Sequence, residues 1–202
     1  MTTSTIYPNG QTLTSSALTQ QAMQILMQNV TCGALGVNPP DFKQVKVDWQ
    51  QEGQPFTPLP SIDGCFLACT TVDKDYGRVR DQVFSGSGPV TETWTYTRPW
   101  HIAWTLYGPN AVDRARQLHS TTFLDWFNDL LSTSNLYPLS DPPNPTYIPE
   151  NFNAQWWPRS DFHLDLYEKV TETIQDGAVT SVEVSLNADD LGKVADFTVT
   201  KE

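Results

Sequence analysis

The sequence predicts an α+β protein, in which a mostly antiparallel or mixed sheet carries two helices packed on one face and long proline-rich loops. Several runs alternate apolar and polar residues with the period of two that strands have. Two other segments repeat apolar residues with the helical period, and clusters of proline and glycine separate the segments. We expect one domain over residues 1–202, since this length is typical of a single core.

The two helices are expected at about 14–29 and 110–131. Hydroxyl side chains at the start of the first helix are typical caps, and Gly33 and Gly36 follow it as terminators. Asn110 is the predicted N-cap of the second helix. Its amphipathic stripe ends in a broad apolar surface, which we expect to be buried. The residues of this broad end are Phe123, Trp126, Phe127, Leu130 and Leu131.

The strands are expected at about 42–49, 64–72, 90–107, 162–174, 182–186 and 194–199, the last being a possible extra C-terminal strand. The run at 64–72 is apolar on both faces, as central strands are. In the run at 90–107, Pro99 predicts a bulge or an edge, because proline cannot donate to a ladder. Turn residues predict one hairpin near Asp75 to Gly77 and another at Asp176-Gly177, which would pair 162–174 with 182–186.

Three stretches, at about 50–63, 73–89 and 132–158, are predicted to be loops or arms. The last holds six prolines and several aromatic residues, a combination that suits a contact surface because a stiff chain loses little entropy on docking. It could instead pack along its own domain, and we favour contact with a neighbouring chain. The candidate contact residues are Phe56, Tyr76, Arg78, Arg80, Tyr137, Tyr147, Phe152, Trp156, Trp157 and Arg159.

The formal net charge is −11, which disfavours sequence-specific binding to duplex DNA because the phosphates would be repelled. Such a surface would let DNA slide past it. The three cysteines have no zinc spacing and are expected to be small buried side chains in a reducing compartment. The N-terminal residues do not have the pattern of a signal peptide, and the apolar runs are too short for a membrane span.

Few residues have a pattern typical of chemistry. The turn before Asn110 has too few glycines to cradle a phosphate and lacks a nucleophile, so we interpret it as a structural joint. Asp161, His163 and Asp165 share one face of a strand, but the two carboxylates would lie about 13 Å apart, too far to share one ion. We expect no catalytic, cofactor or metal residues, and hence no enzyme.

The chain resembles the phage neck or tail terminator proteins in the runs PFTPLPSIDGCFLACTTVDKDYG, TWTYTRPWHIAWTLYGPNAVDRARQLHSTTFLDWF and LYPLSDPPNPTYIPENFNAQWWPRSDFHLDLYEKVTETIQDGAVTSVEV. In that family a strand ending in aromatic-Gly-x-x-Ala leads into a helix. A proline-containing loop and an aromatic-Arg pair then precede a long strand and a closing hairpin. The similarity covers about residues 12–187, and this chain departs from the pattern at Pro99 and after Asn187.

The resemblance implies a structural protein of the virion neck or tail that is assembled in the bacterial host cytoplasm. Such proteins form a homo-oligomeric ring, commonly a hexamer, on the last ring of the tail tube protein and present a surface to the head–tail connector. Genomic DNA would pass through the lumen, and no membrane would be involved. The alternatives are a head-completion connector, a tail-tube protein, or a small phage hydrolase or nuclease that uses Asp161, His163 and Asp165.

Overall fold

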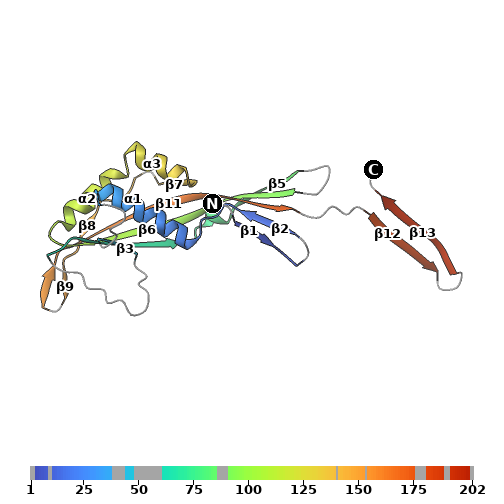
Figure 1. Ribbon diagram of the computed structural model, residues 1–202, viewed down its shortest axis with the longest axis horizontal. Helices are drawn as coiled ribbons and strands as arrows, with labels where there is room; N and C mark the ends of the chain where they lie inside the picture. The colour runs from blue at the N-terminus through green and yellow to red at the C-terminus, as the bar shows by residue number, and fades with distance from the viewer. Residues whose placement is uncertain are drawn as a thin grey trace.

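Two 17-residue strands run side by side through the centre of the main sheet in the computed structural model (Figure 1). Strands β6 (Thr91–Tyr107) and β11 (Arg159–Gln175) pair antiparallel in unbroken register, from Arg159 opposite Tyr107 to Gln175 opposite Thr91. The structure describes residues 3–8, 11–37, 44–47, 61–85, 91–139, 141–152, 154–175, 181–188 and 192–200.

Short strands pair in succession along the two outer edges of this central pair. Strands β4 (Gly64–Thr71) and β5 (Arg80–Ser85) pair with β6, whereas β2 (Thr12–Ser15), β7 (Leu136–Pro138) and β8 (Thr146–Tyr147) pair with β11. Strand β3 (Val45–Val47) extends the sheet beside β4 in parallel, and β1 (Thr3–Ile6) extends it beside β2. Two separate two-stranded sheets are formed by β9 (Glu150–Phe152) with β10 (Gln155–Trp157) and by β12 (Ser181–Ala188) with β13 (Gly192–Thr200).

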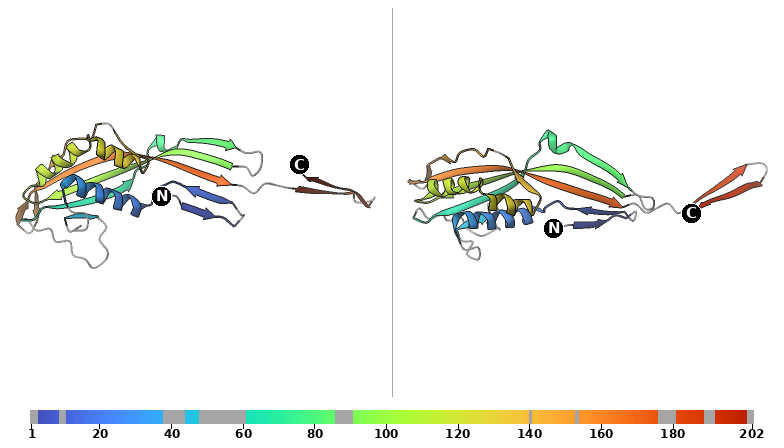
Figure 2. Two further views of the ribbon diagram at one scale, coloured as in Figure 1. Left: turned by 45° about the horizontal axis from the view of Figure 1, so that its top comes forward. Right: turned by 90° about the horizontal axis from the view of Figure 1, so that it is seen from above.

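Helices α1 (Gln20–Leu35), α2 (Ala111–Thr121) and α3 (Asp125–Ser132) lie on one face of the sheet, as Figure 2 shows from two sides. We call this the helix-side face and the opposite one the open face. The helix-side residues of the central strands form the core beneath the helices, where Trp104 stacks on Phe162 with ring centroids 5.2 Å apart. The other strand residues buried in this core are Cys65, Leu67, Cys69, Trp100, Ile102, Leu106, Leu164 and Leu166.

The helices cover only the half of the sheet that contains β3 and β4 (Figure 1). The other half we call the distal sheet: β1, β2 and β5 with residues 91–98 of β6 and 168–175 of β11. Here β1 and β2 curl toward the side that carries α1 (Figure 2). The sheet therefore has one half with a covered core and one half without helical cover.

Glu168 marks the boundary between the two halves and is 1% exposed. Its carboxylate accepts hydrogen bonds from Arg98 Nε at 2.7 Å, from the indole N–H of Trp100 at 2.7 Å and from the backbone N–H of Leu18 at 2.6 Å. The last bond fixes the chain just before α1, whose N-cap is Thr19. One buried carboxylate thus joins β6, β11 and the entry to α1.

The helix boundaries correct the sequence prediction. The first helix begins at Gln20 instead of Thr14, because Thr14 pairs with β11 in strand β2, and it continues past Gly33 to a left-handed Gly36 with φ of 64°. The predicted helix at 110–131 is two helices, α2 and α3, so there are three helices and not two. At this break the hydroxyls of Thr121 and Thr122 donate to the carbonyl oxygens of Gln117 and His119, and such bonds compete with helical ones. Three residues of the predicted buried stripe are consequently exposed: Phe123, Trp126 and Leu130.

Several strand predictions also need correction. Pro99 causes no bulge in the β6–β11 register. Its carbonyl accepts from Val72 N–H at 3.0 Å, but proline has no N–H to return the bond, so the β4–β6 ladder ends at Thr71. The turn near Asp75 is the 3-10 helix η1 (Asp75–Arg78), and β5 follows it inside the predicted loop 73–89.

The C-terminal half of the chain departs further from expectation. The predicted loop 132–158 contains β7 to β10, because short strands fit between its prolines. The strand after β11 pairs with β13 instead of returning along β11, so the hairpin prediction was wrong, and Asp176 and Gly177 lie outside the described residues. The strand expected at 194–199 is confirmed as β13. Of the predicted strand 42–49, residues 45–47 are confirmed and 42, 43, 48 and 49 lie outside the described residues.

Gly108 is predicted to tolerate no side chain. Its φ is 112°, and a Cβ there would lie 2.7 Å from Asp63 Cα. We expect Gly108→Ala to lower the free energy of unfolding by about 2 kcal/mol or more, measured by urea denaturation. The matched control is Gly33→Ala on α1, where the added Cβ would make an ordinary 3.8 Å contact with the side chain of Trp126. A loss below about 0.5 kcal/mol for Gly108→Ala would contradict this account.

Replacing Glu168 should be among the most destabilising single changes in the described part of the chain. Glu168→Leu would leave the Arg98 guanidinium and the Trp100 N–H without their acceptor. We expect a loss of about 3–5 kcal/mol in urea denaturation, as is typical when one partner of a buried ion pair is removed. Glu168→Gln should lose less, because it keeps the shape and one acceptor oxygen. Equal stability of the Leu variant and the wild type would refute the role assigned to this carboxylate.

Candidate functional site

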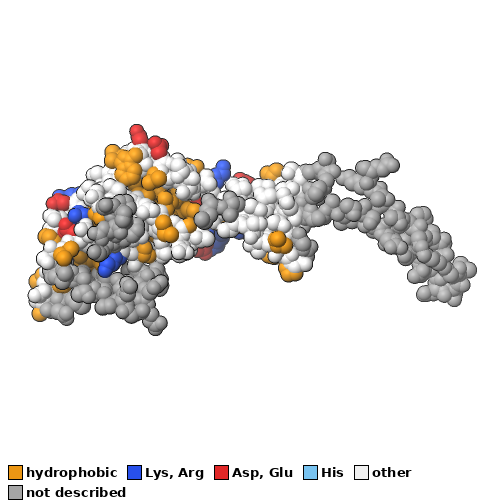
Figure 3. All heavy atoms as spheres, viewed as in Figure 1, with side chains coloured by type: hydrophobic (Ala, Val, Ile, Leu, Met, Phe, Trp, Pro, Cys, Tyr) orange, Lys and Arg blue, Asp and Glu red, His pale blue; other side chains and the backbone are white. Residues whose placement is uncertain are grey.

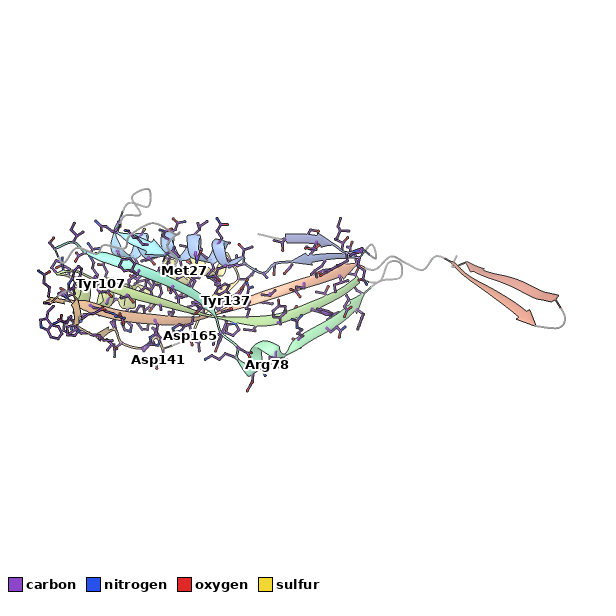
Figure 4. All side chains as sticks on the ribbon, turned by 90° about the horizontal axis from the view of Figure 1, so that it is seen from below. Met27, Arg78, Tyr107, Tyr137, Asp141 and Asp165 are labelled. Atoms are coloured by element: carbon purple, nitrogen blue, oxygen red, sulfur yellow. The ribbon has the colours of Figure 1, made fainter. Side chains whose placement is uncertain are left out.

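The open face of the sheet carries a row of polar and aromatic side chains that includes several predicted contact residues. Tyr107 lies at one end of the row, Asp165 and Tyr137 lie near its middle, and Arg78 lies on η1 (Figure 4). Strand alternation places the odd-numbered residues of β6 and β11 on this face, opposite the helices. We take this row and the distal sheet as the candidate interaction surfaces.

Arg159 organises the end of the row beside β9 and β10. Its guanidinium donates to both oxygens of Asp161 at 2.9 and 2.8 Å and to Glu150 at 3.2 Å, and it lies over the ring of Tyr107. The hydrogen bonds to Asp161 raise the pKa of Arg159 above its ordinary value, so its charge is permanent. Burial and a 2.8 Å hydrogen bond to Glu150 raise the pKa of Tyr107 to about 12. The cluster therefore places one guanidinium between two carboxylates and ties β11 to β9 at this end of the sheet.

A second cluster lies in the middle of the row. His101 Nδ1 is 2.6 Å from Asp165, Lys74 Nζ is 3.8 Å from the other oxygen of Asp165, and the rings of His101 and His163 have centroids 5.2 Å apart. Asp165 and Asp161 are thus bonded to different basic groups, and the trio Asp161, His163 and Asp165 does not converge on one point. Within the described residues, no three His, Cys, Asp or Glu side chains are grouped so that they could hold a metal ion.

Arg80 organises the distal sheet. It lies over the ring of Tyr96 at 4.4 Å and pairs with Glu172 at 3.5 Å, and Glu172 also accepts from the Tyr96 hydroxyl at 3.0 Å. On the open face of the sheet, a hollow of about 470 Å³ opens beside Val79, Tyr137 and Lys169. Arg80, predicted as a contact residue, is half exposed and already engaged within its own sheet.

The remaining predicted contact residues are scattered among several elements. Tyr137, Tyr147 and Trp156 are 47%, 53% and 69% exposed on β7, β8 and β10, while Arg78 pairs with Asp73 and Asp75. Trp157 is buried within the chain and packs edge-on against Tyr107. Phe56 lies outside the described residues, and for Tyr76 and Phe152 the structure describes the backbone only.

Some exposed apolar residues were not predicted from the sequence. Figure 3 shows apolar side chains on α3 and on the β1–β2 hairpin. On the distal sheet, Ile6, Val83 and Phe84 are 76%, 62% and 64% exposed. Strand β5 has the sequence RDQVFS, in which Val83 and Phe84 are adjacent and do not alternate with polar residues, and its charged residues and the following glycines favoured a loop.

The joint before α2 is held by Asp63 and not by the predicted Asn110 cap. Asn110 makes no side-chain capping bond; Asp63 accepts from its backbone N–H, its side-chain amide and Arg114 Nε, each at 3.0 Å. Burial raises the pKa of Asp63, but the hydrogen bonds from Asn110 and the charge of Arg114 outweigh burial and hold that pKa below its ordinary value. An acidic side chain therefore compensates the positive end of α2.

The three cysteines, Cys32, Cys65 and Cys69, are free and buried. Burial raises the pKa of each thiol, for Cys69 to about 12, so all three are protonated at neutral pH. This agrees with their predicted role as small apolar side chains. None of the helices within the described ranges is long and apolar enough to cross a membrane.

Comparison with known protein families identifies the chain's family. The model of a family described as phage neck terminator protein matches residues 16–189, which is most of the chain. No match was found among curated proteins. The matched range includes both central strands and all three helices, and it ends before β13.

Asp63→Asn should destabilise the protein in a pH-dependent way. The pKa of Asp63 is lower when folded than when unfolded, so its contribution is present above the unfolded value, near 4, and is lost as pH falls through the folded value. We expect the variant to lose about 1–2 kcal/mol at pH 7, and this difference from the wild type to shrink as the pH falls below the ordinary value of an aspartate, in urea denaturation across that range.

The matched control is Asp113→Asn, also in the α2 region. Asp113 is 80% exposed and its carboxylate is 3.7 Å from Arg116, so a change within about 0.5 kcal/mol is expected. An Asp63→Asn loss that is the same at pH 7 and pH 3 would show that the carboxylate charge has no part in the cap.

Proposed function

The chain belongs to the phage neck terminator protein family, and from this premise we propose that it is a structural virion protein that forms a ring, commonly of six copies, at the head-proximal end of the tail tube. In that position it would stop growth of the tube and present a joining surface to the head–tail connector. We propose a single domain that is assembled in the host cytoplasm.

The observation that carries this proposal is the distal sheet, which has neither helical cover nor protected edges. Its edge strands, β1 and β5, each have one neighbour among the described strands. Unpaired strand edges and exposed apolar residues such as Ile6 and Phe84 favour association with another chain. Two different edges on one copy support a head-to-tail contact, and such contacts close into rings when the rotation between copies is fixed.

The predicted contact residues support several neighbours. Trp156 and Tyr147 are exposed toward the end of the molecule that carries β9 and β10, away from the distal sheet. We propose that these residues, with Tyr137 and Arg78, contact the tail tube protein or the connector, while the distal sheet contacts other copies. Phe56, Tyr76 and Phe152 remain proposed contacts of the same kind.

Two structural alternatives are distinguished by what the protein does to the tail tube. A head-completion connector would bind the head side and leave tube length unchanged, and a tail-tube protein would itself polymerise. The hydrolase or nuclease alternative has less support. Its candidate residues Asp161 and Asp165 are bonded to Arg159 and His101, which leaves no shared acid–base pair with His163.

Purified protein should shorten growing tail tubes. We expect electron microscopy of polymerising tube protein to show shorter tubes with added protein, and a ring of extra density at one end. Trp156→Ser should reduce this capping by about tenfold, as loss of an exposed aromatic anchor at an interface does. Ile25→Ser, at a position 53% exposed on α1, is the matched control and should cap normally. Unchanged tube lengths at micromolar wild-type protein would overturn the proposal.

A further inference from the structure

The C-terminal hairpin has one wholly apolar face. Strands β12 and β13 place Val182 opposite Val199, Val184 opposite Phe197 and Leu186 opposite Ala195. Residues directly opposite in an antiparallel pair share a face, so these six apolar residues lie together. The alternate positions hold Glu183, Ser185, Asp196 and Thr198, and the register shift after Leu186 passes over Val194.

Such a hairpin needs something to pack against. An isolated two-stranded hairpin is marginally stable at best, and an apolar face left in water adds to its cost. Strands β12 and β13 pair with each other and with no other described strand. In Figures 1 and 2 they lie beyond the end of the distal sheet, on the side away from the helices. No strand of the main sheet within the described residues pairs with the hairpin.

A matching surface exists on the helix-side face of the distal sheet. The register aligns Phe84, Glu92, Ile174 and Leu13 in one row across β5, β6, β11 and β2. The next row holds Gln82, Trp94, Glu172 and Ser15, so the apolar side chains of this face stand among polar ones. Phe84 is 64% exposed, and Leu13, Trp94 and Ile174 are half-buried.

We propose that the β12–β13 hairpin of one copy packs its apolar face on the helix-side face of the distal sheet of a second copy. Both surfaces are β-sheet faces, and two such faces pack about 10 Å apart with interdigitating side chains. The charged positions of the hairpin remain on its outer face. Hairpin and receiving surface are different parts of the chain, so each copy donates one and receives one, as a closed ring requires. The contact itself is inferred from the two surfaces, and only its role in closing a ring rests on the proposed function.

Adjacent residues of β5 provide a matched pair of variants. Phe84 lies on the helix-side face and Val83 on the open face, with nearly equal exposure of 64% and 62%. We expect Phe84→Asp to raise the dissociation constant for self-association at least tenfold, and Val83→Asp to change it less than threefold, in sedimentation velocity and native mass spectrometry. The double change Val184→Asp with Phe197→Asp should act like Phe84→Asp, whereas Ser185→Asp, on the polar face, should not.

Mixing the two defective proteins tests whether the contact is between copies. Phe84→Asp retains a functional hairpin, and the hairpin double variant retains a functional receiving surface. An equimolar mixture should therefore form one-to-one heterodimers that grow no further, although neither variant self-associates alone. This rescue also shows that both variants are folded.

Other results would overturn the inference. If the hairpin folds onto its own distal sheet, both variants lose thermal stability as monomers and the mixture forms no heterodimer. If the hairpin binds the tail tube protein instead, the double variant self-associates like the wild type and fails only to cap tubes. Normal self-association by both variants would overturn this contact and leave the proposed function standing. Wild-type protein that associates through Phe84 without capping tubes would overturn the proposed function and leave the contact standing.

Discussion

The pairing of β6 with β11 is the constraint on which the rest of the structure depends. The two strands form seventeen consecutive residue pairs without a register shift. Once one residue lies on a given face of the sheet, alternation therefore fixes the face of every other residue in both strands. Trp100 and Trp104 lie on the helix-side face, so Trp94 and Tyr96 must lie on it too. Helices cover Trp100 and Trp104 but do not cover Trp94 and Tyr96. A single alternating pattern therefore produces a buried core at one end and an uncovered apolar surface at the other.

The polar groups of the chain hold this arrangement in place. Glu168 joins the central strands to the start of α1 at the boundary of the core, and Asp63 joins the start of β4 to α2. On the open face, Arg159 and His101 each hold a different carboxylate. Glu168, Asp63 and His101 each bond to another segment of the same chain, and Arg159 bonds to Asp161 within β11 and to Glu150 on β9. Such pairs rigidify the sheet, whereas a catalytic site needs groups that converge on a shared empty position.

The sequence predicted what depends on local alternation and missed what depends on pairing. The strands at 64–72 and 90–107 were predicted, because apolar periodicity records which residues are buried. The central place expected for the first was not found: β4 lies between β6 and the edge strand β3, and only alternate residues of it are buried. The start of the helix that begins at Gln20 was predicted too early, because the hydroxyl residues before it are equally suited to a strand. These residues form the strand β2 because β11 pairs with them. The break after α2 arises from side-chain bonds of Thr121 and Thr122 that propensity does not reveal. Asp63 was missed as the cap because it is distant in sequence from Asn110.

The candidate contact residues divide into exposed and buried ones for a similar reason. The exposed Trp156 and the buried Trp157 are neighbours with identical chemistry, and only the tertiary structure distinguishes them.

The distribution of charge gives a physical reason why such a protein could surround DNA without holding it. All six arginines, Arg78, Arg80, Arg98, Arg114, Arg116 and Arg159, form ion pairs with carboxylates of the same chain. Arginine is the residue best suited to bind phosphate, because its planar guanidinium can donate hydrogen bonds to two oxygens at once. Here each arginine has a carboxylate neighbour in its own chain, closely for Arg159 and Arg98 and loosely for the exposed Arg116, while the excess of acidic residues gives the chain its net charge of −11. A ring of such subunits would repel a phosphate backbone from every side, and repulsion from all sides centres a passing duplex instead of arresting it on one wall.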